Sequence, residues 1–98
     1  MNDIVRLQAE IDDIDDKIIA LLTDRFVHSR EIGRIKLRNN QLLFDPERVS
    51  SQRQTFVDKC EATGIDAGMA ERLIRVIVDQ VIVERSALKQ ADGTAAQV

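Results

Sequence analysis

The sequence has few of the residues that build β-sheets and loops. Its 98 residues include no tryptophan, no tyrosine, three phenylalanines, one proline and four glycines. Aromatic residues favour strands, whereas proline and glycine interrupt helices and form turns. The rest of the composition, 44% hydrophobic and 32% charged, suits a helical protein. It predicts one all-α domain, and a chain this short buries only a modest core unless it associates with a second copy.

Cysteine and histidine are equally scarce, which limits covalent and metal chemistry. Cys60 is the single cysteine, so an intramolecular disulfide is excluded, and we expect this thiol to be a small core residue. One thiol and one histidine argue against a metal site. There is no glycine-rich phosphate loop and no set of nucleophile, base and orienting residue. We expect no metal and no cofactor, so an enzyme built from this chain would act by positioning and electrostatics.

Neither charge nor hydropathy points to a large partner. The formal net charge of −3 argues against generic binding to nucleic acid or to anionic lipid, which require a basic surface. The first residues lack the apolar core of a signal peptide, and no stretch approaches the roughly 18 apolar residues of a membrane span. We expect a soluble cytoplasmic protein whose partner is a small molecule, with any cationic site confined to one place.

The first predicted helix, residues 3–38, is too long for a small globule. It would extend about 50 Å at 1.5 Å per residue. Its apolar residues recur in sevens, which is the spacing of a buried helix seam, and Arg25 and His28 interrupt them. Two shorter segments cannot cover such a seam, so we predict an intertwined homodimer whose first helices pair. The seam residues are Ile4, Leu7, Ile11, Ile14, Ile18, Leu21, Ile32 and Ile35.

Two further helices follow, each with a recognisable start. Asp45 is a good N-cap, Pro46 suits the first helical position, and Gly64 should end the second helix. Asp66 should cap the third helix. Residues 92–98 have nothing to pack against, so we predict a helical domain over residues 1–91 and a disordered tail over 92–98. The stripe expected on the third helix is Met69, Leu73, Ile77, Val81, Arg85 and Leu88.

Several cations stand where apolar or acidic residues would be favoured. Arg25 could lie along apolar surface, fix the register of a coiled coil, or bind an anion. Lys36 points the same way about 16 Å further along the helix, although a cation near a helix C-terminus is also favoured by the dipole. Arg48 is poorly placed for the dipole, and Arg85 interrupts an apolar stripe. Together they suggest a dry pocket for a compact dianion, while His28 is better explained as a half-buried seam histidine bonded to a neighbour.

The stretches "IDDIDDKIIALLTDR", "IGRIK" and "DPERV" together resemble the all-helical (AroQ-type, type II) chorismate mutase family. The resemblance extends from residue 4 to about residue 90. It implies a three-helix protomer with a very long first helix, in an interlocked homodimer with two sites built from both chains. It also implies a cofactor-free isomerase of aromatic amino acid biosynthesis, which converts chorismate to prephenate by a Claisen rearrangement without a covalent intermediate.

By position in the family pattern, the resemblance assigns roles to the cations. Arg25 would bind the enolpyruvyl carboxylate of the substrate, Arg48 would hold the ring carboxylate, and Lys36 would be a catalytic donor to the ether oxygen. Asp45 would accept a hydrogen bond from the substituent at ring carbon 4. An arginine would then interrupt the seam because the seam opens into the site.

The chain also departs from the family pattern at substrate-binding positions. The arginine that usually reaches into the partner's site falls at Gln8, and the usual glutamate after the loop arginine is Val49. The usual serine and glutamine of the third helix fall at Val81 and Arg85. Arg85 is therefore a second catalytic candidate, which would supply the missing cation.

These departures leave three alternatives to chorismate mutase open. Two are enzymes of the same fold, isochorismate pyruvate lyase and 4-amino-4-deoxychorismate mutase, whose substrates carry the same two carboxylates. An amino substituent would pair well with Asp45 and poorly with Arg85, which weighs against the amino compound. The third is a non-catalytic helical dimer that acts as a scaffold.

Overall fold

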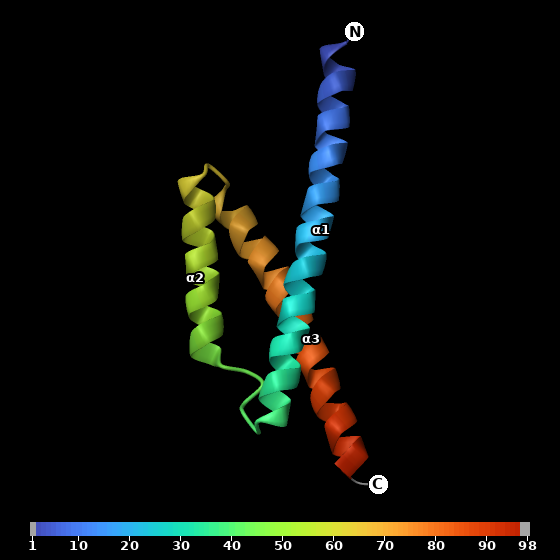
Figure 1. Ribbon diagram of the computed structural model, residues 1–98. Helices are drawn as coiled ribbons and strands as arrows, with labels where there is room; N and C mark the ends of the chain where they lie inside the picture. The colour runs from blue at the N-terminus through green and yellow to red at the C-terminus, as the bar shows by residue number, and fades with distance from the viewer. Residues whose placement is uncertain (1, 97–98) are drawn as a thin grey trace.

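The computed structural model, which describes residues 2–96, consists of three helices. They are α1 (Asp3–Arg38), α2 (Pro46–Ala62) and α3 (Ala67–Ala96), and the described residues contain no strand. Figure 1 shows α1 and α3 crossing, with α2 alongside, in a molecule 65 × 26 × 17 Å in extent. The predicted all-α class with three helices is confirmed. None of the described helices is both long enough and apolar enough to cross a membrane.

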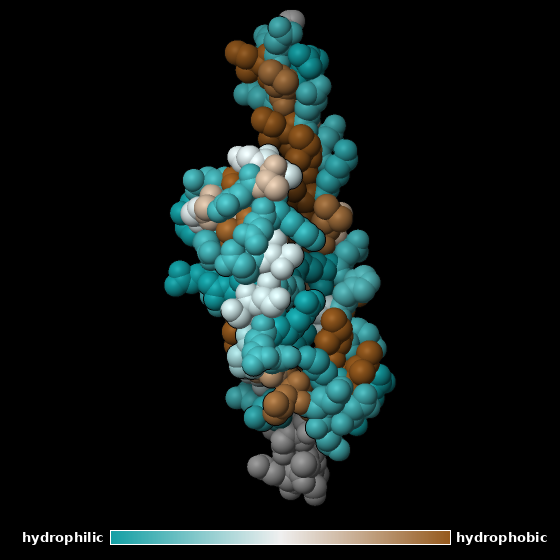
Figure 2. Space-filling model, turned by 90° about the vertical axis from the view of Figure 1, so that its left-hand side faces the viewer, coloured by the Kyte–Doolittle hydropathy of each residue, from teal (hydrophilic) through white to brown (hydrophobic). Residues whose placement is uncertain are grey.

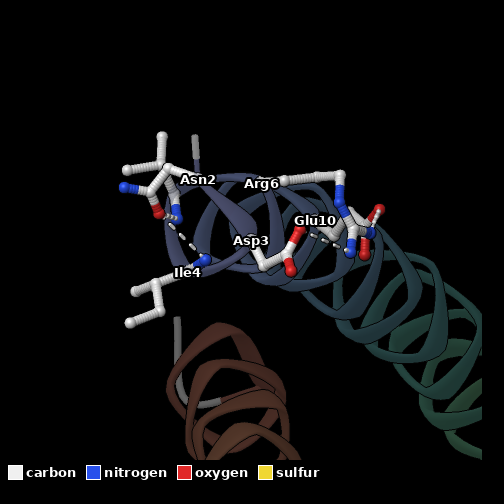
Figure 3. A network of polar contacts seen from close by, with 6 residues as sticks. Asn2, Asp3, Ile4, Arg6 and Glu10 are labelled. Atoms are coloured by element: carbon white, nitrogen blue, oxygen red, sulfur yellow. Dashed lines mark hydrogen bonds and ion pairs between the residues drawn. The ribbon is translucent and has the colours of Figure 1, made fainter.

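The start of α1 is stabilised by its own side chains. The Asn2 carboxamide oxygen accepts hydrogen bonds from the backbone N–H groups of Ile4 and Val5 at 3.2 and 3.3 Å. Arg6 donates to Glu10 one turn later at 3.1 Å and lies 3.8 Å from Asp3 (Figure 3). Exposed pairs at this spacing contribute only about 0.3–0.5 kcal/mol each. These local contacts stabilise the start of the helix, but they do not determine which surface packs against its apolar side.

The predicted caps of α2 and α3 are confirmed. The Asp45 Oδ1 atom accepts from the backbone N–H groups of Glu47 and Arg48 at 3.1 and 3.2 Å, and Pro46 occupies the first turn. An Asp66 carboxylate oxygen accepts from the Met69 N–H at 2.9 Å. Between these helices Gly64 adopts φ +89°, a left-handed conformation that favours glycine and ends α2.

The core forms where α2 packs on α3. Ala70 and Ile74 of α3 are fully buried, whereas Met69 and Leu73 are 51% and 40% exposed. The first two positions of the predicted stripe on α3 are therefore not part of the contact with α2, which uses the neighbouring row of residues. The core residues are Val57, Cys60, Ala70, Ile74, Ile77 and Val78, with Leu22, Phe26, Val49 and Phe56 packed around them.

Helices α1 and α2 are joined through α3. Helix α3 packs against both of them, while no Cα atom of α1 lies within 8 Å of one in α2, although both helices are fully described. Gly33 of α1 is buried at the crossing with α3, where an added Cβ atom would lie 3.0 Å from Leu88 Cδ1. The missing side chain at this position lets the two helices approach closely.

The N-terminal half of α1 has no partner within the described chain. Residues 2–21 are all exposed, including Ile11 at 55% and Ile18 at 49%. Figure 2 shows their apolar side chains as a continuous hydrophobic stripe along this half of the helix. The seam predicted from the sequence is therefore an apolar face that this chain leaves uncovered.

Helix α3 continues to Ala96, into the segment 92–98 for which the sequence predicts a disordered tail. Helical backbone over 92–96 differs from that prediction. Residues 97–98 lie outside the described residues. The predicted end of the domain at residue 91 stays a prediction.

Candidate active site

A cavity of about 420 Å³ lies between the C-terminal half of α1, the start of α2 and the middle of α3. All the site residues predicted from the sequence except Gln8 line it, and they come from all three helices and the loop before α2. Gln8 lies on the exposed N-terminal half of α1. The lining residues are Arg25, His28, Ser29, Ile32, Lys36, Phe44, Asp45, Arg48, Val49, Gln52, Val78, Val81, Ile82 and Arg85.

Arg25 presents a partly desolvated positive charge to this cavity. Its side chain is half-buried, and burial lowers the pKa of its guanidinium from the ordinary value. In the part of the chain that the structure describes, Arg25 makes no ion pair and no side-chain hydrogen bond. A guanidinium that has lost water without gaining a carboxylate is well prepared to bind an anion in the cavity.

Lys36 and Arg48 reach the cavity from consecutive helices. Lys36 is half-buried in the last turn of α1, and Arg48 lies in the first turn of α2. Asp45, between them in the chain, uses one carboxylate oxygen, Oδ1, for both of its cap hydrogen bonds. Its second oxygen is not used by the cap, so Asp45 can start α2 and still accept a hydrogen bond from a bound molecule.

Arg85 lines the cavity but is already bound to protein groups. Its Nη1 atom donates to the Leu43 carbonyl oxygen at 2.8 Å, and its Nη2 atom lies 3.5 Å from the Ser29 carbonyl oxygen and 3.4 Å from Ser29 Oγ. The Nε atom is buried without a hydrogen-bond partner, and burial lowers the pKa of the guanidinium. Arg85 therefore differs from Arg25, because its Nη1 and Nη2 atoms already donate hydrogen bonds to Leu43 and Ser29.

His28 lies one turn after Arg25 at the edge of the cavity. Its Nδ1 atom is 2.7 Å from the Asp24 carbonyl oxygen, and since a carbonyl can only accept, Nδ1 carries the proton. The expected hydrogen bond to a neighbour is confirmed, but the expectation that the side chain is half-buried is wrong, because His28 is exposed. The Nε2 atom makes no hydrogen bond within the described chain.

Sequence reasoning missed three polar or aromatic residues of the lining. Ser29 and Gln52 lie one turn after Arg25 and Arg48 and so share their helix faces, a signal that the sequence contains. Phe44 precedes the Asp45 cap in a loop, where no periodicity indicates its direction.

Part of the lining is an apolar wall that contains two of the predicted positions. Val49 and Val81 are half-buried and line the cavity with Val78 and Ile82. Apolar surroundings strengthen the interaction of a cation with an anion, because they screen charge less than water does. The cavity has one carboxylate, Asp45, against several cations, so it suits a small molecule with more than one negative group.

Comparison with known proteins identifies a family and several relatives. The family model described as "Chorismate mutase type II" matches residues 7–85. The chain is 27% identical over 89 residues to a bifunctional chorismate mutase/prephenate dehydratase of Escherichia coli K12, and 25% identical to the protein of that name from Enterobacter agglomerans. Each match covers 91% of this chain and 23% of the relative. The chain therefore spans less than a quarter of the length of these relatives.

Proposed function

This chain belongs to the type II chorismate mutase family, and on that basis we propose that it catalyses the rearrangement of chorismate to prephenate in aromatic amino acid biosynthesis. The observation that carries the proposal is the convergence of Arg25, Lys36 and Arg48 on one cavity from two helices. These are the positions to which the sequence resemblance assigns the substrate's carboxylates and its ether oxygen. The proposal includes a cytoplasmic location.

The proposed mechanism uses binding and charge alone. Arg25 holds the enolpyruvyl carboxylate and Arg48 the ring carboxylate, which places the enolpyruvyl group over the ring. Because the rearrangement is already unimolecular, this orientation acts by selecting the reactive conformation of the substrate and not by bringing two reactants together. As the C–O bond breaks and the new C–C bond forms, negative charge grows on the ether oxygen, where the Lys36 ammonium donates a hydrogen bond. No nucleophile is needed.

Val49 and Val81 favour a second candidate with the same fold and a related substrate. Family members usually carry a glutamate and a serine at these positions, whereas here both belong to the apolar wall. The carboxylate clamp would hold isochorismate or 4-amino-4-deoxychorismate equally well. Discrimination would then depend on the ring substituent near Asp45. A pyruvate lyase acting on isochorismate, or a mutase acting on the amino compound, is the alternative.

The proposal includes an intertwined homodimer. The apolar seam on residues 4–21 of α1 is exposed, and burying one isoleucine side chain contributes about 1.5–3 kcal/mol. A second copy of α1 offers a seam of the same length and spacing. In that arrangement Gln8 of each α1 would approach the other protomer's cavity, as the resemblance implies. A non-catalytic scaffold would use the same seam but would not need the unpaired charge of Arg25.

The direct test is product identification. The purified protein is incubated separately with chorismate, isochorismate and 4-amino-4-deoxychorismate, and the products are separated and identified by mass spectrometry. Formation of prephenate that is lost in Arg25→Ala, and kept in the exposed control Arg34→Ala, supports the proposal. Salicylate with pyruvate, or the amino analogue of prephenate, selects the second candidate. Inactivity of a folded dimer on all three substrates refutes both. Sedimentation at several concentrations tests the dimer.

A further inference from the structure

The loop between α1 and α2 carries residues of the site but has few hydrogen bonds of its own. Its first part is bonded to the end of α1, where the Gln41 N–H donates to the Lys36 carbonyl oxygen at 2.8 Å. Its last residue, Asp45, caps α2. For residues 42–44, the hydrogen bond found within the described chain is the one from Arg85 to the Leu43 carbonyl oxygen. The position of this segment therefore depends on α3.

Arg85 connects three parts of the fold. Through Leu43 it contacts the loop, and through Ser29 it contacts α1, while its own backbone belongs to α3. Gly33 packs beside this side chain, because an added Cβ there would lie at an ordinary van der Waals distance, 3.7 Å, from both Cγ and Nε of Arg85. The flat guanidinium can donate in two directions at once, which a lysine ammonium or a glutamine amide does less well at this reach.

Arg85 also stands in a wall between two cavities. On the side away from the site lies a second cavity of about 810 Å³, and Arg85 and Phe44 line both. The neighbouring Leu42 is 82% exposed, whereas Leu43 is buried at 9%. Residues 42–44 are thus held by one buried side chain and by the guanidinium of Arg85.

We propose that Arg85 is a positioning residue, which fixes the loop segment 42–44 and through it the start of α2 that carries Asp45 and Arg48. This inference rests on the proposed function and replaces the sequence-based prediction that Arg85 is a second catalytic residue, which supplies the cation missing at Gln8. Loss of the guanidinium should weaken substrate binding, because the loop groups that hold the ground state and the transition state alike become misplaced. A group on the ether oxygen would instead affect the chemical step.

The test combines proteolysis of the loop with steady-state kinetics. Chymotrypsin cleaves after leucine and phenylalanine, so cleavage within residues 42–44 reports how often this segment opens. In Arg85→Gln we expect cleavage there to be about tenfold faster or more, from loss of a charged hydrogen-bond donor. We expect KM to rise about tenfold with kcat changed less than about threefold. Arg85→Lys, which keeps the charge and one donor, should fall between the wild type and Arg85→Gln.

Arg75→Gln is the matched control, since Arg75 is exposed on the same helix, and it should change neither measurement. Circular dichroism establishes that each variant is folded, and Arg85→Lys keeps the test available if Arg85→Gln does not fold. Unchanged loop cleavage in Arg85→Gln, or a loss confined to kcat, would overturn the inference. If the wild type is inactive on all three substrates while loop cleavage is still faster in Arg85→Gln, Arg85 fixes the loop as proposed and the proposed function is refuted.

Discussion

Replacing Arg25 with leucine should lower activity and raise stability at the same time. The guanidinium is half-buried, unpaired within the described chain, and placed on a seam that is aliphatic apart from Arg25 and His28. Removing one partner of a desolvated charge pair costs about 2–5 kcal/mol of binding. At 1.36 kcal/mol per factor of ten, kcat/KM should fall roughly 30- to 5,000-fold.

Stability should change in the opposite direction. Replacing buried charges with apolar residues stabilises proteins by about 1–4 kcal/mol, and partial exposure of Arg25 reduces this to about 1 kcal/mol. For a chain of 98 residues, that gain corresponds to an increase in Tm of about 4–8 °C.

Two measurements on the same samples test the reasoning. Substrate turnover gives kcat/KM, and thermal unfolding followed by circular dichroism gives Tm. Arg34→Leu is the control, because Arg34 is exposed on the same helix and pairs with Glu31 at 3.5 Å; it should leave activity unchanged. A variant Arg25→Leu that keeps activity within about threefold, or that melts below the wild type, would refute the account of Arg25 as an unpaired anion-binding cation.

Three further outcomes follow from the caps, the helix crossing and the core. Asp45→Ala should lose about 1 kcal/mol of unfolding free energy in urea, whereas Asp45→Asn keeps a capping oxygen and should lose less than half of that; equal losses would contradict the cap. Gly33→Val should lower stability by about 1–3 kcal/mol through crowding of Leu88 and Arg85, and a Tm at or above that of the wild type would show that the crossing is loose. Cys60 is 8% exposed, so a thiol reagent should modify it at a rate that rises with urea. Fast modification without urea would show that the contact between α2 and α3 opens readily.

Local signals explain why much of the fold could be predicted from the sequence. Asp45, Pro46 and Gly64 act within a few residues of the helix ends that they mark, so one short stretch contains both cause and effect. Helical periodicity likewise places Arg25 and Lys36 on one face without knowledge of any other segment. The convergence of predicted residues on the cavity follows from these two kinds of signal and from the family pattern.

Contacts between distant segments could not be predicted in this way. The acceptors of Arg85 are a loop carbonyl 42 residues away and Ser29, 56 residues away, and a backbone carbonyl leaves no trace in the sequence. The row of α3 that packs on α2 was also missed. Met69 and Leu73 are as apolar as Ala70 and Ile74, so composition did not decide between the two rows. The ion pair of Arg30 and Glu84, 3.1 Å apart between α1 and α3, was undetectable for the same reason.

The separation of α1 from α2 has a thermodynamic consequence. No Cα atom of one helix lies within 8 Å of the other, although Leu22 and Phe26 of α1 pack against the core cluster between α2 and α3. A molecule that touches Arg25 on α1 and Arg48 on α2 would therefore add a noncovalent cross-link between the two helices. A ligand that binds only the folded state stabilises it by about 2.7 kcal/mol when present at 100 times its Kd. The Tm of the purified protein should therefore rise with substrate concentration. The bound molecule would supply contacts between α1 and α2 that the polypeptide itself does not make.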